Sequence, residues 1–172
     1  SRTILNREEG AFVTTHIGLI NSASPWVRQA HLPSTLNVGA RLLQVGFTVH
    51  IVDLNITTLK EAVLVLLRCD VIGFTVLGTM FLPNIQDDLR ELRSYGYTGP
   101  VLIGGEGVAR LERTVFQRFF PAGTYGDVRF VVEDEELGPA LGLLLRRVPP
   151  REEVSLRPIL EQRAPSHRRA YL

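Results

Sequence analysis

Five short apolar runs alternate with amphipathic helical patterns along most of this chain. Strands that are joined through helices need right-handed crossover connections, and such connections place the strands side by side in one parallel sheet. We therefore predict an α/β fold, a flavodoxin-like (Rossmann-like) three-layer sandwich whose five-stranded parallel sheet has the order 2-1-3-4-5. The predicted strands are Val13–Ile20, Val49–Leu54, Val71–Val76, Pro100–Ile103 and Val128–Val132.

Residues that cap or stop helices mark the segments between the strands. Ser34 is expected to cap the first helix, and Gly46 is expected to stop it. Thr58, followed three residues later by Glu61, forms a capping box that predicts the start of the second helix. Pro83 suits the first turn of the third helix, because a first-turn N–H has no partner within the helix. Further helices are predicted over 108–119 and 136–147.

Length and charge limit the possible functions. The 172 residues suffice for one α/β domain, which we expect at 1–148, followed by an Arg/Pro-rich tail or interdomain linker at 149–172. Residues 1–145 carry 12 basic and 15 acidic side chains, whereas 146–172 carry 7 Arg and 3 Glu. The domain therefore lacks the basic surface that nucleic-acid binding requires. Without a long apolar segment or a signal-peptide pattern, we expect a cytoplasmic protein that binds neither membrane nor nucleic acid.

Residues that ligate metals are few and poorly spaced. Cys69 is the single cysteine, so an internal disulfide or a cysteine-ligated cluster is excluded, and its place after an apolar helix predicts a small buried side chain. His16, His31, His50 and His167 do not have metal-ligand spacing. His16 and His50 fall in strand patterns, where we expect them to be packed or hydrogen-bonded.

Small and hydroxyl-bearing residues end the third and fourth predicted strands. The third ends in Thr75 and Val76 and is followed by Leu77 and Gly78, and the fourth is followed by Gly104 and Gly105. In the order 2-1-3-4-5 the ligand crevice lies where the strand order reverses. The loops expected to meet there are 21–26, 75–80 and 104–107.

Several functions are disfavoured by what these loops lack. A dinucleotide site needs Gly-x-Gly-x-x-Gly after the first strand, and the loop Asn21–Trp26 has no glycine. A flavin phosphate loop at the same place is rich in Ser and Thr, whereas this loop has only Ser22 and Ser24 and is interrupted by Pro25. A phospho-acceptor receiver domain needs an acidic cluster after the first strand and an aspartate ending the third, and both are missing. No nucleophile–base pair is present, so catalysis by this chain alone is not predicted.

The order and spacing of the strand ends resemble the N-terminal cobalamin-binding domain of cobalamin-dependent radical SAM enzymes of the methyltransferase type. The resemblance covers residues 12–145 and includes Asn21–Trp26, Val52–Asn55, Asp70–Gly73, Val101–Gly105 and Val131–Glu136. It implies that Thr75 and Leu77, as the Ser/Thr-x-Leu motif, hold the nucleotide tail of cobalamin together with Gly104 and Gly105. Glu133 matches the acidic end of the fifth strand, although Asp134 stands where the family usually has glycine.

Two further departures from the patterns of cobalamin-dependent enzymes refine this expectation. The Asp-x-His-x-x-Gly motif that ligates cobalt in mutases and corrinoid carriers is absent, as it commonly is in the radical SAM subgroup. The resemblance then implies a cobalt without a protein histidine ligand, with Asn21–Trp26, Arg28 or His31 facing the lower side of the corrin. His31 is kept only as a candidate cobalt ligand. The Cys-x-x-x-Cys-x-x-Cys motif is missing too, so an iron–sulfur cluster and S-adenosylmethionine would belong to a separate domain or partner.

The function that this resemblance implies is a cobalamin-binding module that holds the cofactor for methyl transfer in a radical SAM methyltransferase or a partner enzyme. The alternative is a flavodoxin-like scaffold or interaction domain without a cofactor. Whether the chain is part of an enzyme stays open at this point. The predicted cofactor-binding residues are Asn21, Ser22, Trp26, Thr75, Val76, Leu77, Gly78, Gly104, Gly105, Glu106 and Glu133.

Overall fold

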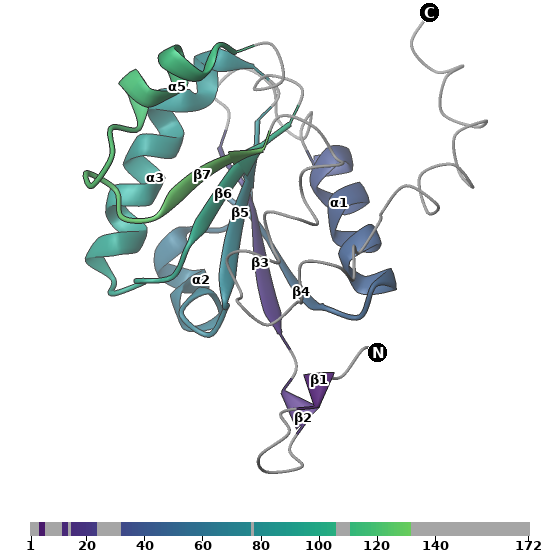
Figure 1. The fold of residues 1–172 in the computed structure, drawn as a ribbon. Coiled ribbons are helices and arrows are strands. Elements are labelled where there is room, and N and C mark those ends of the chain that lie inside the picture. The colour runs from purple at the N-terminus through teal and green to yellow at the C-terminus, as the bar shows by residue number, and fades with distance from the viewer. Residues whose placement is uncertain are drawn as a thin grey trace, which may run out of the picture.

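A five-stranded parallel sheet forms the centre of the protein in the computed structural model (Figure 1). The structure describes residues 4–5, 12–13, 15–23, 32–76, 78–105 and 111–131. The sheet order is β4-β3-β5-β6-β7, which confirms the predicted order 2-1-3-4-5. Its strands are β3 His16–Asn21, β4 Thr48–Asp53, β5 Val71–Thr75, β6 Val101–Gly104 and β7 Val128–Val131.

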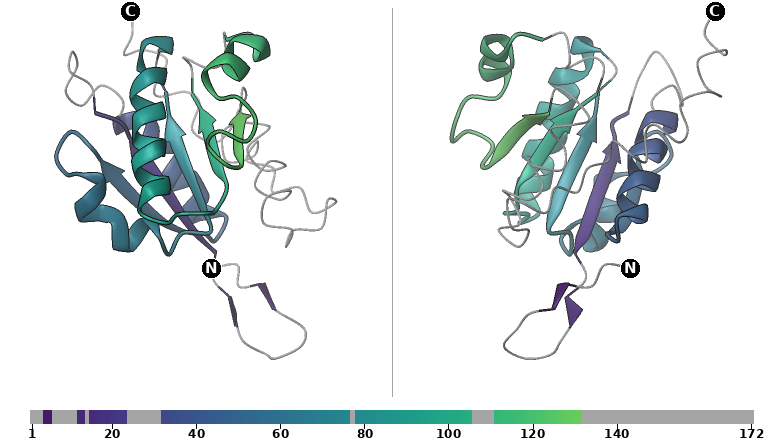
Figure 2. Two further views of the ribbon diagram at one scale, coloured as in Figure 1. Left: turned by 90° about the vertical axis from the view of Figure 1, so that its left-hand side faces the viewer. Right: turned by 45° about the vertical axis from the view of Figure 1, so that its right-hand side comes forward.

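Helices cover both faces of this sheet and give the three predicted layers. Helix α1 (Leu32–Gln44) packs on β3 and β4 from one side. On the opposite side lie α2 (Leu59–Leu66), the short helix η1 (Thr79–Phe81), α3 (Leu82–Ser94) and α5 (Arg113–Phe119), and Figure 2 shows α1 and α3 on opposite faces. The larger core fills the α3 side, and a smaller core around Leu19, Leu42 and Leu102 fills the α1 side.

The first predicted strand is too long at its start. Val13 pairs instead within a separate antiparallel ribbon formed by β1 (Ile4–Leu5) and β2 (Phe12–Val13), and the parallel strand begins at His16. Asp70 fixes this starting point. Its carboxylate accepts from the backbone N–H of His16 at 2.9 Å, while its own N–H donates to the carbonyl of His16 at 2.8 Å.

Local end signals predict most helix boundaries. Thr58 and Glu61 form the expected capping box. Gly46 stops α1 with φ +100°, and Phe47 N–H donates to the carbonyl of Leu42 across this turn. The expected cap at Ser34 is wrong, because α1 already includes Leu32 and therefore holds Ser34 inside its first turns.

In the second half of the chain, β6 is shifted by one residue from the predicted Pro100–Ile103, and one helix begins later than predicted. Helix α5 begins at Arg113, after the N-cap residue Glu112, so Leu111 lies outside it and the predicted start near residue 108 is not supported by the described residues. An extended backbone at Glu112 (φ −62°, ψ 139°) explains why the helix cannot extend back through it. The predicted helix 136–147 and the predicted domain boundary at 148 lie outside the described residues.

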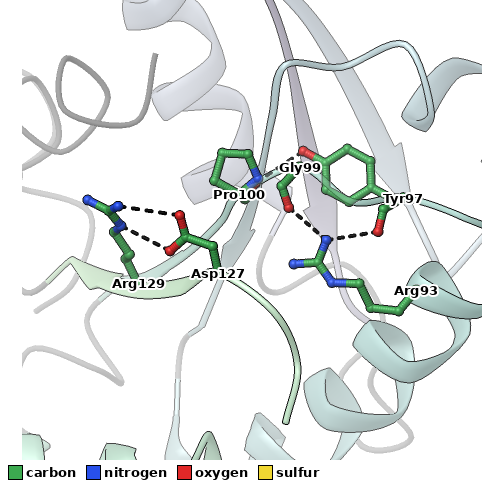
Figure 3. Close-up of polar contacts among 6 residues, drawn as sticks. All are labelled: Arg93, Tyr97, Gly99, Pro100, Asp127 and Arg129. Atoms are coloured by element: carbon green, nitrogen blue, oxygen red, sulfur yellow. Dashed lines mark hydrogen bonds and ion pairs between the residues drawn. The ribbon is translucent and has the colours of Figure 1, made fainter. Parts of the chain in front are cut away.

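Arg93 on α3 ties together the segments that precede β6 and β7, and Figure 3 shows its contacts with the segment before β6. Its Nη1 donates to the carbonyls of Tyr97 and Gly99 at 2.9 and 2.7 Å, and its Nε donates to the carbonyl of Tyr125 at 2.8 Å. Figure 3 also shows the exposed ion pair between Arg129 and Asp127. The Arg93 contacts satisfy three backbone carbonyl acceptors. The Arg129–Asp127 ion pair is exposed, and water can hydrogen-bond both side chains equally well when the pair is absent.

We expect Arg93→Met to lower the free energy of unfolding by about 2–3 kcal/mol, because it leaves three carbonyls without their charged donor. Arg129→Met serves as the matched control and should change stability by less than about 0.5 kcal/mol. Urea unfolding followed by circular dichroism measures both. Similar losses for the two variants would contradict the anchoring role of Arg93.

Candidate functional site

One row of paired residues crosses the sheet at its carboxyl edge. Asn21 of β3 pairs with Asp53 of β4 and with Thr75 of β5, Thr75 pairs with Gly104 of β6, and Gly104 pairs with Val131 of β7. In parallel α/β sheets this edge is where ligands bind. The register therefore brings the predicted residues Asn21, Thr75 and Gly104 into one row.

Asn21 is held in place by the neighbouring carboxylate. Its side chain is 0 % exposed, and its Nδ2 donates to Asp53 Oδ1 at 2.9 Å. The backbone N–H and the Nδ2 of Asn55 donate to the same oxygen at 3.1 and 2.8 Å. Partial burial alone would raise the pKa of Asp53, but these hydrogen bonds together hold it below its ordinary value. Asp53 is therefore ionised at neutral pH.

The amide oxygen of Asn21 is left without a hydrogen-bond partner although it is buried. Since Nδ2 donates to Asp53, Oδ1 must serve as an acceptor. An unpaired buried acceptor costs about 1–3 kcal/mol, which a ligand N–H or O–H donor would recover. The acceptor and the nearby negative charge together favour a ligand group that donates hydrogen bonds and disfavour an anion at this point.

Thr75 faces helix α1. Its hydroxyl lies within hydrogen-bond distance of the hydroxyl of Thr35, a fully buried residue of α1. Thr75 itself is half-buried. Val71 lies on the same face of β5 as Thr75 and belongs to the smaller core, which packs against α1. The predicted tail-binding hydroxyl thus lies between the sheet and α1, on the face where Asn21 contacts Asp53.

The two glycines after β6 have different neighbours. A Cβ on Gly104 would come within 3.1 Å of the carbonyl oxygen of Val131, and a Cβ on Gly105 would overlap the carbonyl oxygen of Val76. Gly105 also has φ +124°, where residues with side chains are strained. Val76 N–H donates to the carbonyl of Gly104 at 2.8 Å, which joins the two strand ends. This close approach of backbones is itself a reason for the Gly-Gly pair.

Ser22 lies on the other side of the sheet from the Asn21 side chain. Its hydroxyl donates to Asp88 Oδ2 of α3 at 2.8 Å, and Asn84 of α3 donates to the carbonyl of Ala23 at 3.1 Å. Successive residues at a strand end point to opposite faces, so Asn21 and Ser22 are directed to different helix layers. The structure therefore does not bring the Ser22 hydroxyl together with Thr75.

Burial raises the pKa of Asp88 to about 6, although the hydrogen bond from Ser22 acts in the opposite direction. Because the folded-state pKa exceeds the unfolded one, Asp88 favours the folded state below about pH 4, and this contribution is lost as pH rises through 6.

We expect Asp88→Asn to raise the free energy of unfolding at pH 7 by about 1–2 kcal/mol, because the amide avoids the burial of a charge and still accepts from Ser22. The gain should vanish near pH 4. Asp87→Asn, on the exposed side of α3, is the control and should give a change below about 0.5 kcal/mol. Thermal unfolding between pH 4 and 8 tests this, and a pH-independent effect of Asp88→Asn would contradict it.

The remaining predicted residues are only partly described. Val76 is buried, and Gly78 is half-buried and precedes η1, where its carbonyl accepts from Phe81 N–H at 3.1 Å. The residues that lie outside the described part of the chain are Trp26, Arg28, His31, Leu77, Glu106 and Glu133.

Three residues of the site were not among the predicted cofactor-binding residues. Asp53 and Asn55 carry a usable signal, because Asp followed two residues later by Asn after a strand is typical of a side-chain-to-backbone turn. Thr35 carries none, since its contact with Thr75 depends on how α1 packs against the sheet.

The two described histidines, His16 and His50, and the cysteine lie away from this edge. His16 Nδ1 and His50 Nε2 are 3.0 Å apart near the amino end of β3, which confirms the expected hydrogen bonding. Cys69 is buried as expected, and burial raises its pKa to about 11. Among the described residues, no group of three His, Cys, Asp or Glu side chains is arranged to hold a metal ion. In the same part of the chain, none of the helices has the length and apolar character that crossing a membrane requires.

Comparison with known proteins identifies solved structures with a similar fold. No protein-family model matches the sequence, and no curated protein matches it. A cobalamin-binding protein from Desulfitobacterium hafniense DCB-2 has a similar structure, with a TM-score of 0.50 and 17% identity over 78% of this chain and 59% of that one. The chain thus spans less than two thirds of that protein. The chemotaxis protein CheY4 of Vibrio cholerae has a TM-score of 0.50 and 15% identity, over 79% of this chain and 100% of that one. At these identities the likeness shows the flavodoxin-like fold alone.

Proposed function

We propose that this chain binds cobalamin, with the nucleotide tail inserted beside the α1 face of the carboxyl sheet edge. The observation that carries the proposal is the row Asp53–Asn21–Thr75–Gly104, in which a buried acceptor without a partner stands beside a threonine hydroxyl and a strand end without a side chain. The cobalamin-binding protein of similar fold supports the same ligand class.

The chemistry of the row suits this ligand better than the alternatives. Cobalamin presents N–H donors on its corrin amides and O–H donors on its ribose, and either type can pair with the Asn21 amide oxygen. The ionised Asp53 repels a phosphate group at that point. A flavin mononucleotide, which would place its phosphate at the β3 end, therefore fits poorly, and the phosphodiester of a cobalamin tail would have to lie away from Asp53. The uncharged benzimidazole end of the tail fits next to Thr75.

The residues of this chain would then bind and orient the cofactor. Asp53 holds the Asn21 amide with its oxygen free, and Thr35 positions the Thr75 hydroxyl. Cobalamin supplies the cobalt that carries a methyl group when it is bound. We further propose that the module serves a radical SAM methyltransferase domain or partner, because the sequence resemblance points to that subgroup and the chain has a single cysteine.

A second candidate function is an interaction scaffold without a cofactor. It is favoured by the internal contacts of the predicted ligand groups, because the Thr75 hydroxyl contacts Thr35 and Gly105 contacts the Val76 backbone. The CheY4 likeness, which extends over all of that protein, is compatible with a flavodoxin-like domain of this second kind.

Equilibrium dialysis of the purified protein against hydroxocobalamin, cobinamide and flavin mononucleotide separates these functions. Cobinamide lacks the nucleotide tail, so we expect it to bind at least ~10-fold more weakly than hydroxocobalamin. Flavin mononucleotide should not bind. Equal binding of cobinamide would show that the tail does not use this edge, and binding of none of the three ligands would favour the scaffold.

A further inference from the structure

Two exposed apolar side chains flank Asn21 at the carboxyl edge. Ile56 follows β4 and is 81% exposed, and Met80 of η1 follows β5 and is 71% exposed. Among the large apolar side chains that the structure describes, only Leu64 of α2 is exposed to a similar extent. Strands β4 and β5 are the two neighbours of β3. The strand ends before Ile56 and Met80 therefore lie on either side of Asn21, two strand spacings or about 10 Å apart.

Both side chains project from hydrogen-bonded turns. Ile56 N–H donates to the carbonyl of Asp53 at 3.1 Å, and Phe81 N–H, next to Met80, donates to the carbonyl of Gly78 at 3.1 Å. The Phe81 side chain is buried in the larger core and fixes η1 to the domain. The exposure of Ile56 and Met80 is therefore a property of an ordered backbone, and a ligand that covers them needs little further ordering of these turns.

The two apolar side chains surround a polar point. The unpaired amide oxygen of Asn21 needs a hydrogen-bond donor, whereas Ile56 and Met80 gain only from contact with apolar surface. One ligand that serves all three must carry a donor and also an apolar surface about 10 Å wide. The Met80 thioether suits an irregular apolar surface, because a methionine side chain is unbranched and polarisable.

We infer that the corrin ring of cobalamin covers the carboxyl edge and buries Ile56 and Met80, while a donor of the same ligand reaches Asn21. This inference rests on the proposed function and assigns two further residues to the same site. A corrin is a wide, flat macrocycle with apolar faces and amide arms, so it supplies both kinds of contact in one molecule. A ligand confined to the space beside Thr75 would leave Ile56 and Met80 in water.

Oxidation of Met80 tests this contact directly. Met80 is the only methionine of the chain, and hydrogen peroxide transfers one oxygen atom to an exposed thioether and is itself reduced to water. Free N-acetylmethionine in the same tube serves as the reference, and fragmentation mass spectrometry locates the added oxygen. In the unloaded chain we expect Met80 to be oxidised within ~3-fold of the reference rate. Much slower oxidation of the unloaded chain would show that another part of the chain already covers Met80, and would overturn the inference.

Ligands that contain the corrin ring should protect Met80. Cobinamide keeps this ring and lacks the nucleotide tail. Saturating hydroxocobalamin and saturating cobinamide should each slow the oxidation of Met80 at least ~10-fold relative to the reference. Protection by hydroxocobalamin alone would mean that Met80 meets the tail, and oxidation unchanged by bound hydroxocobalamin would mean that Met80 meets neither part. Either result would overturn the inference and leave cobalamin binding intact.

Equilibrium dialysis of edge variants tests both residues independently. Met80→Gln and Ile56→Thr should each raise the dissociation constant for hydroxocobalamin at least ~5-fold, because each removes apolar surface from the contact. Leu64→Gln removes an equally exposed apolar side chain from the last turn of α2 and should leave the constant unchanged. Circular dichroism checks that all three variants fold. Unchanged constants in both edge variants would overturn this inference alone, whereas no binding of hydroxocobalamin by the unmodified chain would overturn the proposed function as well.

Discussion

Gly105→Ala is expected to lower the free energy of unfolding by about 4 kcal/mol, enough to leave a marginally stable domain partly unfolded. Two effects add at this position. A side chain at φ +124° is strained, and its Cβ would overlap the carbonyl oxygen of Val76 while lying 2.9 Å from the Val76 nitrogen. Both obstacles are backbone atoms of the neighbouring strand end, which cannot move without breaking the contact between Val76 and Gly104.

Gly96→Ala provides a matched control for the strain alone. Gly96 has φ +97° at the end of α3, and a Cβ there would meet nothing within 4 Å. We expect it to cost about 1–2 kcal/mol. Urea unfolding of the two variants separates strain from overlap, and equal losses for Gly105→Ala and Gly96→Ala would contradict the close approach of β5 and β6 at this edge.

Thr75→Trp is expected to abolish retention of cobalamin if the nucleotide tail inserts between the sheet and α1. The indole would fill the space next to Thr35 that the tail needs. Thr75→Val preserves the shape of the side chain but removes the hydroxyl, and we expect it to weaken binding by about 10-fold through one lost hydrogen bond. Equilibrium dialysis against hydroxocobalamin measures both effects.

A folded control distinguishes a blocked slot from a disrupted fold. Thr114→Trp places the same indole on the exposed surface of α5 and should bind cobalamin as the unmodified chain does. If Thr75→Trp fails to fold, the Thr75→Val variant carries the test by itself. Unchanged binding by folded Thr75→Trp, or by Thr75→Val, would place the tail elsewhere.

Features encoded within a few residues were predictable from the sequence. The Thr58–Glu61 capping box and the Gly46 stop depend on neighbouring residues alone, and both were found. The strand order followed from the alternation of strands and helices. The start of β3 was misplaced because its position depends on Asp70, which is 54 residues away in the chain.

The site was predicted as a set of strand ends, and its internal contacts were not. Alternation along a strand separates Asn21 from Ser22, yet only the packing of α3 shows that Ser22 donates to Asp88. The contact of Thr75 with Thr35 and the unpaired oxygen of Asn21 depend on the register of β3, β4 and β5 and on the position of α1. Such long-range register leaves no local pattern in a single sequence.

The most direct test of the central proposal uses the unmodified chain and hydroxocobalamin. The protein is mixed with an excess of the cofactor and desalted, and the visible spectrum is recorded together with the far-UV circular dichroism. We predict that the corrin absorption bands stay with the protein at about one cofactor per chain. A colourless protein with an intact fold would contradict cobalamin binding and leave the interaction scaffold as the better account.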